Sequence, residues 1–158
     1  MSKLALFLVK SGSEKWSDEA KKLYLKKINA FCKFEIIEIK SNSSSRSEKE
    51  KKIEFEQEKI LSKIQPNDHL ILLDEKGKDF GNSLAFSKFF KKRFELGKPR
   101  IIFLVGGAYG VGEGVKQRAQ DLVKLSSLTF NHHVASLVVL EQLYRAFCID
   151  KNIPYHNQ

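Results

Sequence analysis

Cysteine and proline are scarce in this sequence, and long hydrophobic runs are missing. Its 158 residues include two cysteines and three prolines, and the longest apolar stretches fall well short of the ~20 residues of a membrane-spanning helix. So few cysteines exclude a disulfide-stapled scaffold, and the apolar surroundings of Cys32 and Cys148 favour buried free thiols in a reducing compartment. The apolar run at residues 4–9 leads directly into polar sequence, unlike a secretory signal. We therefore expect a soluble, cytoplasmic protein that does not associate with a membrane.

What is present is the composition of a globular domain. Hydrophobic residues make up 42% of the chain and charged residues 30%, which argues against a disordered tail or a fibrous repeat. A chain of this length buries roughly 68–70% of its unfolded surface, which is enough for a core without a metal or a disulfide. Because no internal repeat divides the chain, residues 1–158 are expected to form a single domain.

Positive charge exceeds negative charge, and the excess is unevenly distributed. Lys and Arg number 28 against 19 Asp and Glu, which gives a formal charge of +9. The net charge is +4 over residues 1–60, +4 over residues 61–100 and +1 over residues 101–158. A basic surface attracts a phosphate backbone. The first hundred residues are therefore expected to face a nucleic acid, and the last third to serve another purpose.

Apolar runs alternate with helical patterns along the chain. Strands are expected at residues 4–9, 34–39, 69–73, 101–105 and 122–128. Helices are expected at residues 17–31, 48–64, 83–96, 115–119 and 134–149, with Ser17 and Asp18 capping the first, Gly97 ending the third and Asn131 capping the last. The serine-rich residues 41–47 are typical of a mobile loop. This alternation predicts an α/β fold with a mainly parallel sheet, but it does not reveal the strand order.

A glycine-rich segment follows the fourth expected strand. It contains Gly106, Gly107, Gly110, Gly112 and Gly114 within nine residues. Glycines at a strand end let backbone amides approach a ligand closely. The spacing does not match the dinucleotide pattern G-x-G-x-x-G, and no Lys-Ser or Lys-Thr follows as in a phosphate-binding loop. A ligand-lining role is favoured over a simple turn, because a turn needs only one or two glycines.

The expected last helix is apolar on more than one side. From residue 134 to residue 149, 12 of 16 residues are apolar, and the interruptions are Ser136, Glu141, Gln142 and Arg145. A surface helix normally shows one apolar stripe. The sheet can cover one side and a second copy of the chain another, so a homodimer is expected. A central core helix is the alternative.

The adjacent residues His132 and His133 suggest a metal site at first sight. Adjacent side chains point apart, and no third or fourth ligand stands at a usable spacing. We therefore expect no metal, and we expect a capping or polar role for this stretch.

Residues 88–94, with the sequence KFFKKRF, interleave aromatic and basic side chains as single-stranded RNA binders do. Helical spacing offers another explanation, in which Phe86, Phe90 and Phe94 face the core and the cations face water. The second explanation is favoured for the aromatic residues. The exposed cations can still contribute to a phosphate-binding surface.

Five short motifs stand in order along the chain. They are LLD with GK within residues 72–78, VGGAxG at 105–110, LSSLTFNH at 125–132, EQLYRA at 141–146 and PYH at 154–156. In this combination the chain resembles the RlmH family, the 23S rRNA pseudouridine N3-methyltransferases of the SPOUT superfamily. The resemblance covers the whole chain, including its length and its basic first half.

The resemblance implies a fold and a cofactor. The SPOUT fold is an α/β trefoil knot with a mainly parallel sheet of five to six strands flanked by helices, and its threaded C-terminal segment forms the cofactor pocket of a homodimer. S-adenosylmethionine would lie against Leu73, Gly106, Gly107, Gly110, Leu125, Ser126, Ser127, Leu128, Thr129 and Phe130. The glycines would then let the main chain contact an adenosine and a sulfonium.

The resemblance also implies a reaction. The N3 atom of a pseudouridine in 23S rRNA, presented by the assembled ribosome, would attack the methyl carbon of the sulfonium. The imide nitrogen must lose its proton and be held in near-attack geometry. His156 and Tyr155 are candidates for general-base or positioning roles, and Arg145 for binding a phosphate or carbonyl oxygen. Alternatively, Arg145 pairs with Glu141, one helical turn earlier.

Three positions depart from the family pattern. Family members commonly have Pro where Asn131 stands, Arg where Ser136 stands and a basic residue where Asn157 stands. The two missing cations leave two alternatives open. One is a SPOUT methyltransferase for another RNA nucleotide, and the other is a non-catalytic, ribosome-associated RNA-binding protein.

Overall fold

The computed structural model describes residues 2–10, 12–41 and 48–157. Within these ranges the strands are β1 (Lys3–Lys10), β2 (Phe34–Lys40), β3 (His69–Lys78), β4 (Arg100–Val105) and β5 (Asp121–Val123). The helices are α1 (Lys15–Asn29), α2 (Lys49–Ser62), α3 (Ser83–Phe94), α4 (Glu113–Arg118) and α5 (His132–Asp150). Residues 42–47, which make up most of the predicted serine-rich loop, lie outside the described ranges.

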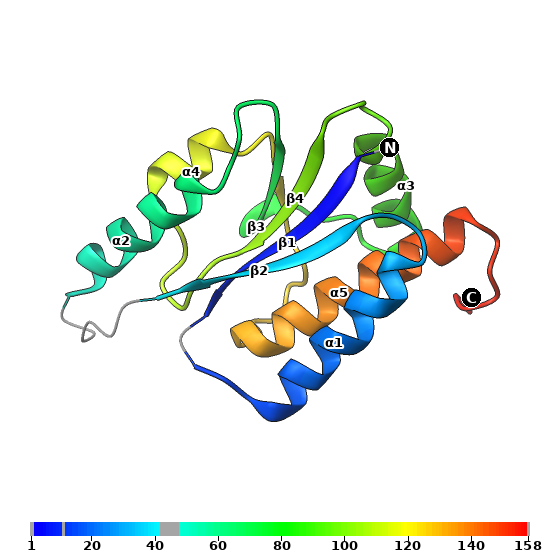
Figure 1. Cartoon of the computed structure of the whole chain (residues 1–158), viewed down its shortest axis with the longest axis horizontal. Coiled ribbons are helices and arrows are strands. Elements are labelled where there is room, and N and C mark those ends of the chain that lie inside the picture. Colours follow the sequence, from blue (N-terminus) through cyan, green and yellow to red (C-terminus); the bar gives the residue numbers. More distant parts are fainter. Residues whose placement is uncertain (1, 11, 42–47, 158) are drawn as a thin grey trace.

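The five strands form one sheet in the order β2-β1-β4-β3-β5 (Figure 1). Neighbouring strands pair in parallel along the whole of this sheet, which confirms the predicted α/β fold. Because the strands run the same way, their carboxyl ends gather at one edge, where open α/β sheets bind ligands. The order itself comes from the tertiary structure, since β4 is inserted between β1 and β3.

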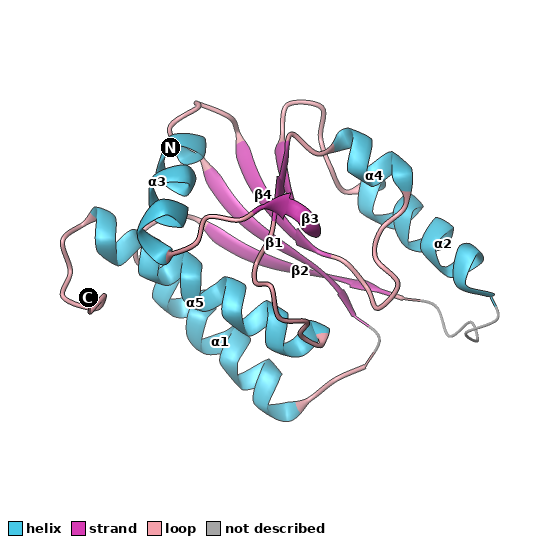
Figure 2. Cartoon of the chain, turned by 180° about the vertical axis from the view of Figure 1, so that it is seen from behind, coloured by secondary structure: helices cyan, strands magenta, loops and turns pink. Residues whose placement is uncertain are grey.

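Helices cover both faces of the sheet. Figures 1 and 2 show α1, α3 and α5 on one face and α2 and α4 on the other. The continuous apolar run of β1 follows from this arrangement, because alternate residues enter two different cores. Leu4, Leu6 and Leu8 enter the core under α1, α3 and α5, and Ala5, Phe7 and Val9 enter the core under α2 and α4.

Helix α3 confirms the core explanation of its aromatic residues. Phe90 is buried and its ring lies 5.7 Å from that of Phe103 on β4. Phe86 and Phe94 pack against the same core, whereas Lys88 and Lys92 are exposed. The helix ends as predicted before Gly97, which has a positive φ of 73°.

Helix α5 packs against α1, α3 and β4 of its own chain. The ring of Phe147 stacks on that of Phe31 at 5.1 Å and meets that of Phe90 edge-on at 5.3 Å. These contacts account for apolar residues on more than one side of α5 within a single chain, as the central-helix alternative expects. The homodimer stays a prediction.

Several element boundaries differ from the predicted ones, among them the end of β3, which extends past residue 73 to Lys78. Helix α1 begins at Lys15, because the Asp18 N–H already donates to the Glu14 carbonyl at 3.0 Å. The predicted cap at Ser17 is therefore wrong, and Ser17 is a buried residue of the first turn. Strand β5 ends at Val123, not at residue 128, because the chain then leaves the sheet edge. The predicted cap of α5 is confirmed, since the Asn131 side chain accepts from Val134 N at 3.0 Å.

The two thiols are free and buried, as predicted. Burial raises the pKa of the Cys32 thiol to about 11, which keeps it protonated and unreactive near neutral pH. Among the described residues, no helix is long and apolar enough to cross a membrane.

Candidate functional site

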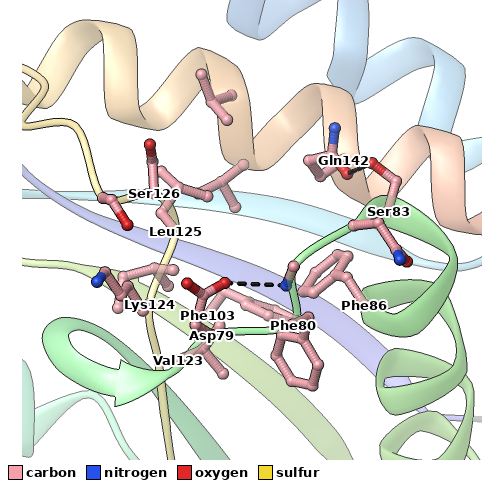
Figure 3. Close-up of a pocket in the computed structure, with 16 residues that line it drawn as sticks. Asp79, Phe80, Ser83, Phe86, Phe103, Val123, Lys124, Leu125, Ser126 and Gln142 are labelled. Carbon is pink, nitrogen blue, oxygen red and sulfur yellow. Dashed lines mark hydrogen bonds between the residues drawn. The ribbon is translucent and has the colours of Figure 1, made fainter.

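A cavity of about 390 Å³ opens beyond the carboxyl ends of β3 and β5, between the start of α3 and the middle of α5 (Figure 3). Its position matches the sheet edge where α/β folds bind ligands. The residues that line it are Leu73, Asp79, Phe80, Gly81, Asn82, Ser83, Phe86, Phe103, Val123, Lys124, Leu125, Ser126, Ser127, Val138, Val139 and Gln142.

The floor of the cavity is held by a close approach of two backbone segments. A Cβ atom at Gly77 would lie 2.5 Å from the backbone of Val123, so glycine is needed where β3 passes β5. Beyond this point Lys124 N donates to the Lys78 carbonyl at 2.9 Å. The end of β3 and the loop after β5 are thus fixed against each other.

The rim next to α3 is held by side chains. Asp79 Oδ1 accepts from Gly81 N at 2.9 Å, and Asn82 caps α3 by accepting from Ala85 N at 2.9 Å. Ser83 Oγ donates to Gln142 Oε1 on α5 at 2.7 Å (Figure 3). The rim therefore joins α3 to α5 before any ligand is present.

The lining combines an apolar wall with a polar rim. Phe86 and Phe103 provide aromatic surface, and Asp79 and Lys124 are the charged side chains among the lining residues. A pocket of this size and chemistry suits a ligand with a flat apolar body and polar ends. The opposite charges of Asp79 and Lys124 suit a zwitterionic group.

Part of the predicted cofactor set lines this cavity. Leu73, Leu125, Ser126 and Ser127 lie in its wall. The remaining predicted cofactor residues, which are Gly106, Gly107, Gly110, Leu128, Thr129 and Phe130, are absent from the lining. Their role in holding a ligand stays a prediction.

The glycines after β4 form a tight turn. Gly110 N donates to the Gly107 carbonyl at 3.0 Å, and Gly110 has a positive φ of 79°. A Cβ at Gly107 would come within 3.1 Å of both carboxylate oxygens of the buried Glu56. Further along, Gly114 N donates to Gln57 Oε1 at 2.9 Å. Close approaches of the backbone to α2 thus explain several of these glycines.

The three predicted catalytic residues meet at the C-terminal end of α5. Arg145 donates through Nε to Glu141 Oε1 at 2.7 Å, and its Nη1 lies 2.9 Å from His156 Nδ1. The guanidinium lies over the Tyr155 ring at 4.8 Å, and the Tyr155 hydroxyl donates to Glu141 Oε1 at 3.4 Å. We call Glu141, Arg145, Tyr155 and His156 the tail cluster. The alternative for Arg145, a pair with Glu141, is confirmed, and Arg145 contacts His156 as well.

Arg145 determines the tautomer of His156. A guanidinium only donates hydrogen bonds, so the Nδ1 atom of His156 accepts and its Nε2 atom carries the proton. Among the described residues, this buried Nε2 atom has no hydrogen-bond partner. His156 therefore presents a free N–H donor.

A chain of hydrogen bonds connects the cavity to the tail cluster. Gln142 accepts from Ser83 at the cavity rim and donates through Nε2 to Glu141 Oε2 at 3.3 Å. Glu141 in turn accepts from Arg145, which donates to His156. No residue of the tail cluster is among the cavity lining. One chain thus links the two regions without placing His156 in the cavity.

Sequence reasoning missed Ser83, Asn82 and Gln142 as site residues. Gln142 and Glu141 interrupt an otherwise apolar helix, and such an interruption was the available signal, since buried polar side chains need partners. Asn82 stands where an N-cap is expected before α3. Only the packing of α3 on α5 shows that these side chains meet.

The rings of the paired histidines at the start of α5 lie together, with centroids 4.1 Å apart, so the expectation that these side chains point apart is wrong. Within the described ranges, no group of three His, Cys, Asp or Glu that could hold a metal ion is found. Burial, with help from His133 and the charges of Lys21 and Lys52, lowers the pKa of His132 from its ordinary value of 6.5. His132 is therefore favoured in its neutral form.

Comparison with known families and sequences gives consistent results. The family model described as "Predicted SPOUT methyltransferase" matches residues 2–156. A ribosomal RNA large subunit methyltransferase H from Bdellovibrio bacteriovorus is 42% identical over 155 residues, which cover 98% of this chain and 99% of the relative. The protein of the same name from Flavobacterium johnsoniae is 44% identical over 137 residues, which cover 85% of this chain and 86% of the relative.

Solved structures share the fold at low sequence identity. A probable methylase family protein from Haemophilus influenzae Rd KW20 superposes with a TM-score of 0.56 at 9% identity, covering 96% of this chain and 67% of the other. A probable rRNA-methyltransferase from Porphyromonas gingivalis gives a TM-score of 0.51 at 12% identity, covering 94% and 69%. These similarities concern the fold alone.

Proposed function

The chain belongs to the SPOUT methyltransferase family, and from this premise we propose that it methylates N3 of a pseudouridine in 23S rRNA with S-adenosylmethionine as methyl donor. The observation that carries the proposal is the 42% identity to a ribosomal RNA large subunit methyltransferase H over nearly the full length of both chains. The protein is thus an RNA methyltransferase, and its basic surface suits an RNA substrate.

The cavity at the edge of the sheet fits S-adenosylmethionine. Its volume lies in the range of small-molecule sites, Phe86 and Phe103 offer apolar surface to an adenine, and Asp79 and Lys124 match the charges of an amino-acid end. When bound, the sulfonium supplies an electrophilic methyl group. We propose that the predicted set holds it, namely Leu73, Gly106, Gly107, Gly110, Leu125, Ser126, Ser127, Leu128, Thr129 and Phe130.

The tail cluster is suited to holding the acceptor base. The free Nε2–H of His156 can donate to a carbonyl oxygen beside N3, and Arg145 adds a positive charge next to it. Such donors stabilise the anion that forms when the imide loses its proton. Tyr155 keeps the cluster together through Glu141. We therefore favour a positioning and charge-stabilising role for His156 over proton abstraction, because Arg145 occupies its Nδ1 lone pair. The imide proton would then pass to solvent water.

We propose further that the chain acts as a homodimer in the cytoplasm, on rRNA within the assembled ribosome. The tail cluster of a chain does not line that chain's own cavity, so a complete site needs a tail from elsewhere. Trp16 and Leu23 on α1 are 43% and 50% exposed beside α5, and a second copy would cover them. We also propose that the C-terminal segment is threaded into a knot and that residues 1–158 form a single domain.

The test is incubation of the protein with methyl-labelled S-adenosylmethionine and ribosomes that lack the modification, followed by nucleoside analysis. We expect label on a single nucleoside, N3-methylpseudouridine. Label on another nucleoside would replace the leading proposal by a SPOUT methyltransferase of different specificity.

One observation favours a second candidate, a non-catalytic RNA-binding protein of the ribosome. Ser136, where family members commonly carry Arg, is buried and its hydroxyl donates to the His132 carbonyl at 2.6 Å. A cation that could face RNA is thus replaced by an internal contact. Calorimetry separates the two candidates, because a protein that has lost the chemistry is expected to give no heat with S-adenosylmethionine.

A further inference from the structure

A second groove lies beside the cofactor cavity. It has a volume of about 450 Å³ and runs between the end of β3 and the outer side of α3. Asp79 and Phe80 line both the groove and the cavity, so the two spaces share a wall. The groove is lined by Lys78, Asp79, Phe80, Ala85, Lys88, Phe89, Lys92 and Arg93.

Half of the residues that line this groove are basic, and its floor is aromatic. The rings of Phe80 and Phe89 lie 4.8 Å apart. Lys78 Nζ lies 5.2 Å from the Phe80 centroid, and the Arg93 guanidinium lies 4.5 Å from the Phe89 centroid. The rings hold the cationic side chains by cation–π attraction and leave their charges available.

Arg93 is the one cation of the groove whose charge is compensated by an ion pair within the described residues. Its Nε and Nη2 atoms donate to the Asp121 carboxylate at 2.8 and 2.9 Å. Lys78, Lys88 and Lys92 have no carboxylate within 4 Å in the described part of the chain. The contrast is clear on α3 itself, where the neighbouring Lys91 pairs with Asp150 at 2.8 Å.

Two of the lysines repel each other on α3. Lys88 and Lys92 stand four residues apart on an exposed helical face, where like charges destabilise a helix. Asp79, whose carboxylate accepts from the backbone N–H of Gly81, is the one acidic residue in the groove lining. Three lysines without an ion pair in the described part of the chain outnumber it, so the groove is suited to an external polyanion.

We propose that this lysine groove binds the sugar–phosphate backbone of the substrate RNA next to the nucleotide that is methylated. The inference rests on the proposed function for the identity of the strand. Because the groove and the cofactor cavity share Asp79 and Phe80, a strand whose phosphates contact Lys78, Lys88 and Lys92 passes the mouth of the cavity. The groove would position the RNA, since phosphate contacts fix register without reading sequence.

The test compares two triple variants with the same net charge. The groove variant combines Lys78→Ala, Lys88→Ala and Lys92→Ala and so removes the three lysine charges of the groove. Lys33→Ala, Lys63→Ala and Lys98→Ala remove three exposed lysines near the opposite, amino-terminal edge of the sheet. Both are compared with the wild type for thermal midpoint, for affinity to S-adenosylmethionine and for binding of a short fluorescein-labelled single-stranded RNA across a salt titration.

We expect the groove variant to bind the RNA at least tenfold more weakly. The slope of log affinity against log salt should become shallower by about 2, since each lost phosphate contact removes about 0.7. Its KM for unmodified ribosomes should rise, while cofactor affinity and kcat at saturating ribosomes stay close to wild type. The control variant should differ little from wild type.

Equal RNA affinity and equal salt slope for the two variants would overturn the proposal. So would tighter groove-dependent binding of polyglutamate than of the RNA, which would point to an acidic protein. A failure of the groove and a failure of the proposed function give different results. Groove-dependent RNA binding without any methyl transfer by the wild type would refute the enzyme and keep the groove. Methyl transfer by the wild type, together with an unchanged KM in the groove variant, would keep the enzyme and refute the groove.

Discussion

Helix α5 carries two regions of opposite character. Its middle contributes Val138, Val139 and Gln142 to a cavity that is already formed by one chain. Towards its C-terminal end, Glu141 and Arg145 bind the C-terminal tail through a charged network. The cavity is apolar with a polar rim, whereas the tail cluster consists of charged and hydrogen-bonding groups. The proposed cofactor cavity and the proposed acceptor site are thus built on one helix but do not share a space within one chain.

The connection between these regions is narrow. Among the described residues it consists of the hydrogen bonds from Ser83 through Gln142 to Glu141. Substitutions on either side are therefore expected to separate two properties, cofactor affinity and turnover. The proposed composite site, in which one chain's tail serves the cavity of a second chain, would account for the separation of the two regions.

The largest effect is expected for His156→Ala. Loss of the Nε2–H donor should reduce kcat by roughly 100- to 1,000-fold, the range for removal of one hydrogen-bond donor that stabilises a developing anion. The affinity for S-adenosylmethionine should not change, because His156 does not line the cavity. Single-turnover kinetics and calorimetry measure the two quantities.

Asn157→Ala is the matched control, since Asn157 is the exposed neighbour of His156. It should leave turnover unchanged. Unchanged turnover in His156→Ala would mean that the tail cluster takes no part in the reaction. The functional difference between the two regions would then be refuted.

A second, somewhat smaller effect is expected from filling the cavity. Val138→Trp places an indole in the lining, and displacement of the cofactor by even 1 Å can lower the rate by about 100-fold. Here cofactor affinity should fall together with the rate, in contrast to His156→Ala. Val138→Ala, which enlarges the cavity, is the control and should keep most activity. Wild-type cofactor affinity in Val138→Trp would show that the ligand binds elsewhere.

Mixing the two defective variants tests how the regions combine. If the tail acts across a dimer, co-expression of His156→Ala with Val138→Trp should restore about a quarter of wild-type activity, because about half of randomly assembled dimers are mixed and each holds one intact site. Co-expression of Val138→Trp with the doubly substituted chain should restore none. A tail that serves its own cavity, or a monomeric protein, gives no recovery in either case.

The smallest effect is expected for Asp121→Asn, which acts on the support of the cavity. Burial opposes ionisation of Asp121, but hydrogen bonds from Arg93 and His69 prevail and lower the pKa of its carboxyl below the ordinary value of 3.8. A depressed pKa stabilises the fold above the unfolded value and the stabilisation is lost as pH falls through the folded value. The variant should lose about 1–3 kcal/mol at neutral pH and show a flatter acid dependence in denaturant titrations.

Asp150→Asn is the control for this change. Asp150 pairs with the exposed Lys91, and surface ion pairs contribute little to stability. The free energy of unfolding of Asp150→Asn should therefore change less than that of Asp121→Asn. A similar loss in both variants would mean that the Asp121 pair has no special role in holding β5 against β3 and α3.

Much of the fold follows from local sequence pattern. The interiors of β1 and β4 were predictable because a parallel strand buried on both faces is a continuous apolar run. Element ends were less predictable. Helix α1 starts two residues before the expected cap at Ser17, and β5 stops at Val123, because hydrogen bonding to neighbouring segments decides where an element ends.

The candidate site was predictable only in part. Leu73 and residues 125–127 were expected at the cofactor and line the cavity, and His156, Tyr155 and Arg145 were expected together and meet in the tail cluster. Asn82, Ser83 and Gln142 were missed. Ser83 lies about 60 residues before Gln142 in sequence, and the two side chains meet where α3 packs on α5. The local sequence pattern carries no information on such a contact.

The sequence by itself determined the alternation of strands and helices, the family and the inward-facing aromatic residues of α3, because these follow from periodicity and from motifs of adjacent residues. The tertiary structure decided which groups lie next to the outward-facing lysines of α3. The packing of α3 beside the end of β3 brings Lys78 into one groove with Lys88 and Lys92. Their charges act together beside the cavity, since the field of a charge depends on distance in space.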